Sequence, residues 1–124
     1  MTYVERMMVR HGHPRHIIVG IVGYAWTLYF LWEHAWMWAA AAVLISVALG
    51  AIVTPRNHEE NLAQTTLGKI MLLHLHPVNV VLQSAGLLFL LYGVWVHSAI
   101  YIMMAGSIIL IGHMWGWHRV NEAL

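Results

Sequence analysis

Four long apolar segments dominate this sequence and leave few folds open to it. They cover residues 17–32, 35–53, 78–96 and 99–115, and each is close to the roughly 20 residues that a helix needs to cross a bilayer. Only 9% of the chain is charged, whereas soluble domains carry about 25% charged residues, so a water-facing surface cannot be covered. The sequence therefore predicts an all-α integral membrane protein, a single membrane domain over residues 1–124 with four transmembrane helices.

The connections between the apolar segments predict how these helices pair. Only Glu33 and His34 separate the first two segments, and only His97 and Ser98 separate the last two, so each pair forms a tight helical hairpin. Residues 55–75 are polar at first and then apolar. We expect a cytoplasmic connection there, whose second half lies along the membrane interface as an amphipathic helix.

The basic residues predict the orientation in the membrane. In this topology all six fall on one side: Arg6, Arg10, Arg15, Arg56, Lys69 and Arg119. Cytoplasmic loops carry an excess of lysine and arginine, so both termini are predicted to be cytoplasmic. The net charge is only +1, which argues against a nucleic-acid partner. Membrane lipid is the expected partner, because basic residues at this level attract anionic headgroups.

The sequence repeats itself at an offset of 63 residues. Repeat 1 covers about residues 13–62 and repeat 2 about residues 76–124, and the connection at about 55–75 includes the end of repeat 1. The matched residues include His13 with His76, Pro14 with Pro77, Gly23 with Gly86, His34 with His97, and Arg56 with Arg119. The two hairpins keep the same orientation, so they are tandem parallel repeats, and such repeats are usually related by an axis along the membrane normal.

A polar stripe enters the membrane from the His-Pro step of each repeat. In repeat 2 it consists of His76, Asn79, Gln83 and Gly86, and in repeat 1 of His13, His16, Gly20 and Gly23. The spacing places each set on one helix face, and polar groups inside a bilayer often mark function. His113 has no counterpart in repeat 1, where Gly50 stands. This asymmetry favours a working site in repeat 2.

These residues predict a metal site near the cytoplasmic face. The chain has no cysteine, and neutral imidazole suits Fe(II) and Zn(II). The candidate ligands are His13, His16, His76, His113 and His118, and the candidate catalytic groups are Asn79 and Gln83, which would orient the reacting species. A simpler interpretation of each His-Pro step is a helix start, with proline in the first turn and a capping residue before it.

The second repeat resembles a family of small membrane proteins related to the yeast endoplasmic-reticulum dioxygenase of 2-hydroxy fatty acids. The resemblance lies in HPVNVVLQSAG and, one hairpin later, IGHMWGWHRVNEA. The matching residues are His76, Pro77, Asn79, Gly86, Gly112 and His113. This chain has Gln83 where the family has a second histidine, and it lacks the acidic residue expected after His113. The resemblance implies iron, oxygen, a lipid substrate and oxidoreductase activity.

Other functions remain open at this stage, and the sequence leaves undecided whether the protein is an enzyme. One alternative is a homo-oligomeric small transporter or channel, although no charged residue lies within the spans. A haem protein is a further alternative, since histidines 21 residues apart bracket each first span of a hairpin. The last alternative is a structural membrane subunit without catalysis.

Overall fold

The computed structural model describes the backbone of residues 1–56 and 58–123, and the side chains as far as Arg119. Within these ranges the chain forms seven α-helices and no strand. They are α1 (Tyr3–His11), α2 (Pro14–Trp32), α3 (Trp36–Val53), α4 (Glu59–Gln64), α5 (Thr66–Leu73), α6 (Pro77–Trp95) and α7 (Ala99–Ala123). The prediction of an all-α fold is confirmed.

The four long helices α2, α3, α6 and α7 form the two predicted hairpins. Among the described residues, three helices are long and apolar enough to cross a membrane: α3, α6 and the Ala99–Arg119 part of α7. The fourth, α2, begins with Pro14, Arg15 and His16, and these polar residues lower its mean hydropathy. The three apolar helices indicate an integral membrane protein.

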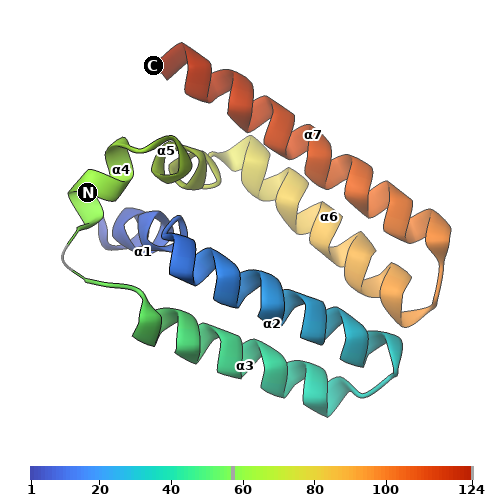
Figure 1. Ribbon diagram of the computed structural model, residues 1–124. Helices are drawn as coiled ribbons and strands as arrows, with labels where there is room; N and C mark the ends of the chain where they lie inside the picture. Colours follow the sequence, from blue (N-terminus) through green and yellow to red (C-terminus); the bar gives the residue numbers. More distant parts are fainter. Residues whose placement is uncertain (57, 124) are drawn as a thin grey trace.

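The long helices lie side by side in the order α3, α2, α6, α7 (Figure 1). Helix α2 packs on α3, α6 packs on α7, and the two hairpins meet through α2 and α6. This open layer leaves large apolar side chains uncovered, for example Leu44 at 70%, Ile52 at 77% and Leu88 at 68% exposure. So large an apolar surface is not compatible with a monomer in water, but it suits a hydrocarbon environment.

Both hairpins turn through a histidine in the left-handed backbone region. His34 has φ 56° and His97 has φ 54°, a conformation that glycine adopts more readily than other residues. In each turn the N–H that follows reaches back five residues, from Ala35 to Phe30 and from Ser98 to Gly93, at 2.8 Å in both cases. This is the Schellman pattern of helix termination, and it closes both hairpins in the same way.

The two hairpin tips exchange aromatic contacts. The His34 ring lies 4.4 Å from the Trp95 ring, and the His97 ring lies 4.0 Å from the Trp32 ring. His97 Nε2–H also donates to the carbonyl of Trp32 at 2.7 Å. The four residues are two equivalent pairs at the 63-residue offset. Each histidine therefore packs on the tryptophan of the other hairpin, which is the contact expected around a pseudo-two-fold axis.

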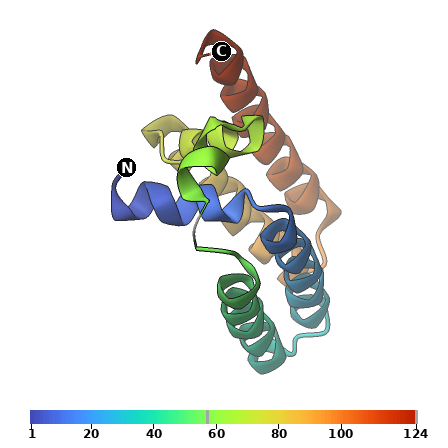
Figure 2. The same cartoon turned by 60° about the vertical axis from the view of Figure 1, so that its left-hand side comes forward.

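Helices α1, α4 and α5 gather at the opposite end of the long helices (Figures 1 and 2). Sequence reasoning expected one interfacial helix within 55–75, where the structure has α4 and α5, and it did not foresee α1. The available signal for α1 was the capping box of Thr2 and Glu5. The Thr2 N–H donates to the Glu5 carboxylate at 2.6 Å and lowers the pKa of that carboxyl group.

The duplicated unit thus includes a short helix before the hairpin as well as the hairpin itself. Thr2 caps α1 through the N–H of Glu5, and Thr65 caps α5 through the N–H of Gly68. Both pairs of residues match at the 63-residue offset, and α1 packs against α5. We call α1, α2 and α3 the first unit, and α5, α6 and α7 the second unit.

Candidate functional site

The two histidines of the His-Pro steps are helix caps. His13 and His76 are the N-cap residues of α2 and α6, and Pro14 and Pro77 occupy the first turns. His13 Nδ1 accepts from the Arg15 N–H at 3.2 Å, and His76 Nδ1 accepts from the Val78 N–H at 3.3 Å. The lone pair of Nδ1 is therefore used by the backbone in both residues.

The other predicted ligand of the first unit, His16, lies beside His11 of α1. Their ring centroids are 4.2 Å apart. His11 Nδ1–H donates to the carbonyl of Met7 at 2.7 Å, and His16 Nδ1–H donates to Thr54 Oγ1 at 3.1 Å. The Thr54 hydroxyl in turn donates to the carbonyl of Gly50 at 2.6 Å. Both imidazoles keep their Nε2 lone pairs when neutral.

Two histidines of the second unit are arranged similarly but farther apart. His74 and His113 have ring centroids 5.5 Å apart. His74 Nδ1–H donates to the carbonyl of Ile70, and His113 Nδ1–H donates to that of Ile109, both at 2.8 Å. His11 and His74 match at the 63-residue offset. His113 was among the predicted metal ligands, whereas His11 and His74 were not, although their repetition at this offset was the signal that could have found them.

Asn79 and Gln83 form a hydrogen-bonded network. Asn79 is 1% exposed. Its Nδ2 donates to the carbonyl of Leu73, and its Oδ1 accepts from Gln83 Nε2, both at 3.3 Å. Gln83 Nε2 also lies 3.3 Å from His113 Nδ1, but the single proton on that nitrogen is given to Ile109, so this approach is a packing contact. The hydrogen bonds join α5 to α6, the packing contact adds α7, and the arrangement favours a positioning role for both amides.

The five predicted metal ligands do not meet in one place. His13 and His76 are caps, His16 and His113 belong to different units, and His118 lies on an exposed part of α7. Among the described residues, no three histidine or glutamate side chains lie close enough to hold a metal ion. The described residues instead place His11 beside His16 in the first unit and His74 beside His113 in the second unit.

A groove of about 380 Å³ opens between the three helices of the first unit. Its lining residues are Tyr3, Met7, Arg10, His11, His16, Gly20, Ser46, Val47, Gly50 and Ala51. Arg10 spans the groove and donates through Nη2 to the carbonyls of Thr54 at 3.4 Å and Ala51 at 3.5 Å. Its Nε is buried and has no partner within the described part of the chain. We call this cavity the first-unit groove.

The second unit has larger side chains at several equivalent positions. At the 63-residue offset Gly20 becomes Gln83, Ser46 becomes Ile109 and Gly50 becomes His113. A Cβ added at Gly20 would meet nothing within 4 Å, so this glycine borders open space. A Cβ at Gly50 would lie 2.6 Å from the His16 ring. Small residues therefore leave the first-unit groove open and make room for His16 within it.

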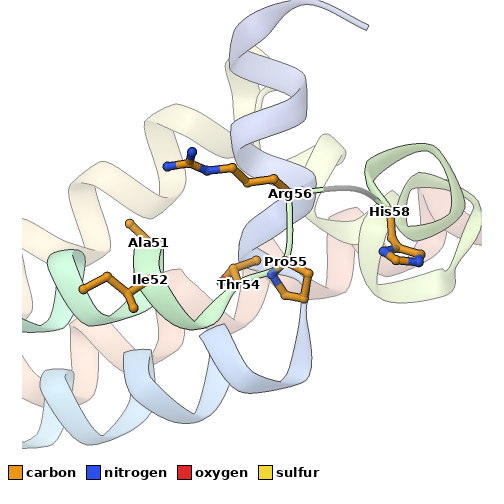
Figure 3. Close-up of a pocket in the computed structure, with 6 residues that line it drawn as sticks. All are labelled: Ala51, Ile52, Thr54, Pro55, Arg56 and His58. Atoms are coloured by element: carbon orange, nitrogen blue, oxygen red, sulfur yellow. The ribbon is translucent and has the colours of Figure 1, made fainter.

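A second hollow, of about 490 Å³, adjoins the carboxyl end of α3 (Figure 3). Its lining residues are Ala51, Ile52, Thr54, Pro55, Arg56 and His58. The Arg56 side chain extends in the direction of Ala51, whereas His58 lies beyond the loop (Figure 3). The hollow shares Ala51 with the first-unit groove, so it adds a second arginine to the same end of α3.

Taken together, the described residues form a small α-helical protein with membrane-spanning character, two copies of a three-helix unit, and a groove of mixed polar and apolar lining in the first unit. No protein-family model, curated protein or solved structure matches the chain.

Proposed function

We propose that the chain crosses the membrane four times, through α2, α3, α6 and α7, with both termini on the cytoplasmic side. Helix α2 has 19 residues, as does its equivalent α6. Its polar first turn lies at the end where α1, α4 and α5 gather, at the level of the headgroups. The basic residues of α1, α5 and the α3–α4 loop lie at this same end, which supports a cytoplasmic location.

Cysteine labelling tests this topology, because the chain has no cysteine of its own. Single cysteines replace Val4 in α1, Glu33 at the first tip and Gln64 at the end of α4. A membrane-impermeant maleimide added to intact cells is expected to label Glu33→Cys alone, and to label Val4→Cys and Gln64→Cys only after permeabilisation. Labelling of Val4→Cys and Glu33→Cys from the same side would show that α2 does not cross the bilayer.

The function that the geometry supports best is the binding of one membrane lipid in the first-unit groove. The observation that carries this proposal is the mixed lining of the groove, with Arg10 and His11 contributed by α1 and with Gly20 and Val47 farther along the long helices. A polar end at the headgroup level and an apolar end within the bilayer match the two parts of a lipid. The groove has a volume of about 380 Å³, which is in the range of small-molecule sites.

Filling the groove is expected to remove the lipid without disturbing the fold. A leucine side chain at position 20 enters open space, so Gly20→Leu should fold and retain lipid about tenfold less strongly. Gly106→Leu in α7 is the matched control, since a Cβ there also meets nothing within 4 Å. Native mass spectrometry with mixed phospholipids measures the retention. Equal retention by the parent and Gly20→Leu would overturn the proposal.

A second candidate is metal-dependent oxidation of the bound lipid, which the resemblance of the second repeat to the dioxygenase family implies. The observation that favours it is the His11–His16 pair, in which protein acceptors hold both Nδ1 protons and leave Nε2 free. Such orientation is typical of histidine ligands. The fit is partial, since non-haem iron sites commonly use two histidines and one carboxylate, and no acidic side chain joins this pair in the described residues.

Elemental analysis separates the two candidates. Metal-dependent chemistry predicts about one equivalent of iron or zinc in the purified protein, lost in both His11→Ala and His16→Ala and kept in His58→Ala. His58 is an exposed histidine outside the pair. A parent protein that holds no metal after loading with Fe(II) or Zn(II) would remove this candidate and leave lipid binding as the function.

A further inference from the structure

We infer that the lipid of the first-unit groove carries an anionic headgroup, that Arg10 binds this headgroup, and that each chain holds one such lipid although its unit is duplicated. This inference rests on the proposed lipid binding and goes beyond it in naming the class of lipid, the residue that selects it and the stoichiometry.

Arg10 has hydrogen-bonding capacity that the protein leaves unused. Its Nη2 donates to the carbonyls of Ala51 in the last turn of α3 and of the C-cap residue Thr54, and these bonds hold the guanidinium at the edge of the groove. Its Nε is buried without a partner among the described residues. A buried donor of this kind is costly unless something pairs with it, and guanidinium groups match phosphate and carboxylate oxygens in geometry. The Nε itself is enclosed by the protein, whereas Nη1 donates to no residue of the described part of the chain. A lipid phosphate at the edge of the groove would supply an acceptor for this end of the guanidinium.

The charge of the groove also favours an anion. None of its described lining residues is acidic, and two histidines accompany Arg10. The adjoining hollow adds Arg56 at the same end of α3. Basic residues near the membrane surface attract anionic lipids electrostatically. A zwitterionic headgroup would bring its own cation toward these groups, so the lining selects against it.

The deeper part of the groove is suited to an acyl chain. Gly20 lies one turn beyond His16 on α2, and Val47 lies one turn before Gly50 on α3. Both Gly20 and Val47 are exposed in the chain alone, so the deeper end of the groove is accessible to the hydrocarbon region. A lipid can therefore place its headgroup at Arg10 and its chain along these residues without leaving the bilayer.

The described residues of the second unit do not repeat the lining of this site. Leu73 stands where the first unit has Arg10, so the anion-binding donor is absent. Gln83 and His113 stand where the first unit has Gly20 and Gly50. These side chains lie 3.3 Å apart at the α6–α7 interface, whereas in the first unit Gly20 borders open space and Gly50 makes room for the His16 ring. The duplicated unit therefore provides a single lipid site per chain.

The test compares phosphatidylglycerol with phosphatidylcholine of the same acyl chains, using native mass spectrometry of the full chain in detergent. We expect one phosphatidylglycerol per chain, bound about tenfold more tightly than phosphatidylcholine, and a roughly tenfold loss of this preference in Arg10→Gln. Arg15→Gln removes the same charge from an exposed position and should keep the preference. Arg10→Lys, which retains a cation, should keep part of it and guards against a folding defect.

The outcomes distinguish this inference from the proposed function. Equal binding of both lipids, with loss of both in Gly20→Leu, would overturn the anionic selection and leave lipid binding intact. Binding of neither lipid would overturn both proposals. Two phosphatidylglycerol molecules per chain with equal affinity would overturn the single-site claim. Inorganic phosphate alone should not displace the lipid at millimolar concentration. Displacement would overturn the inference, because it would show that the site binds a free anion and not a membrane lipid.

Discussion

Gly93→Leu is expected to separate the two helices of the second hairpin near its tip. Gly93 is buried, and a Cβ at this position would lie 2.9 Å from the backbone nitrogen of Ile102 and 2.9 Å from Tyr101 Cβ. Backbone atoms cannot move aside as a flexible side chain can, so α6 and α7 must shift apart. Overpacking of this kind costs about 3 kcal/mol. In detergent we expect the Tm to fall by about 10 °C.

Gly106→Leu provides the control for this change as well. It lies on α7 of the same hairpin, and a Cβ there has nothing within 4 Å, so its Tm should stay within a few degrees of the parent's. A Gly93→Leu protein as stable as the parent would show that α6 and α7 do not approach each other as closely as described.

Asn79→Leu is expected to destabilise the second unit by about 2 kcal/mol. The side chain is 1% exposed, and its amide joins the carbonyl of Leu73 to the side chain of Gln83. Leucine fills a similar volume but leaves both groups without their partner, and unpaired polar groups in an apolar setting are costly. Thermal unfolding followed by circular dichroism in detergent measures the loss.

Ser84→Leu in the same helix is the matched control, because Ser84 is exposed and its loss should cost little. If Asn79 were a catalytic group and not a structural one, Asn79→Leu would unfold at the same temperature as the parent. That outcome would contradict the positioning role of Asn79 and would favour a functional site in the second unit.

The long helices could be predicted from the sequence because apolar length is a strong and local signal. The tips at His34 and His97 and the ends of α3 and α6 agree with the predicted segments within one or two residues. Helix α1 was not foreseen, since hydropathy does not mark it and its capping box is a short motif. Helix α2 pairs with α3 as predicted, but its polar first turn lowers the mean hydropathy of the whole helix.

The first-unit groove could not be predicted from the sequence, because it forms through packing between helices that are distant in sequence. In the sequence alone, His113 in place of Gly50 favours a site in the second unit. In the folded chain the His113 ring lies against Gln83, whereas Gly50 leaves space for His16. The same asymmetry therefore favours the first unit once the neighbours are known. The His-Pro steps, in contrast, could be interpreted as helix caps from the sequence, because a capping residue followed by proline is a local pattern.

The most direct test of this account is photo-crosslinking of a membrane lipid to the protein in vesicles. A phosphatidylglycerol with a photoactivatable acyl chain is incorporated, and crosslinked residues are identified by peptide mass spectrometry with and without excess unlabelled lipid. We expect the crosslinks removed by competition to fall on the first unit, around Gly20 and Val47. Competed crosslinks at the equivalent residues of the second unit, Gln83 and Leu110, or equally in both units, would contradict it.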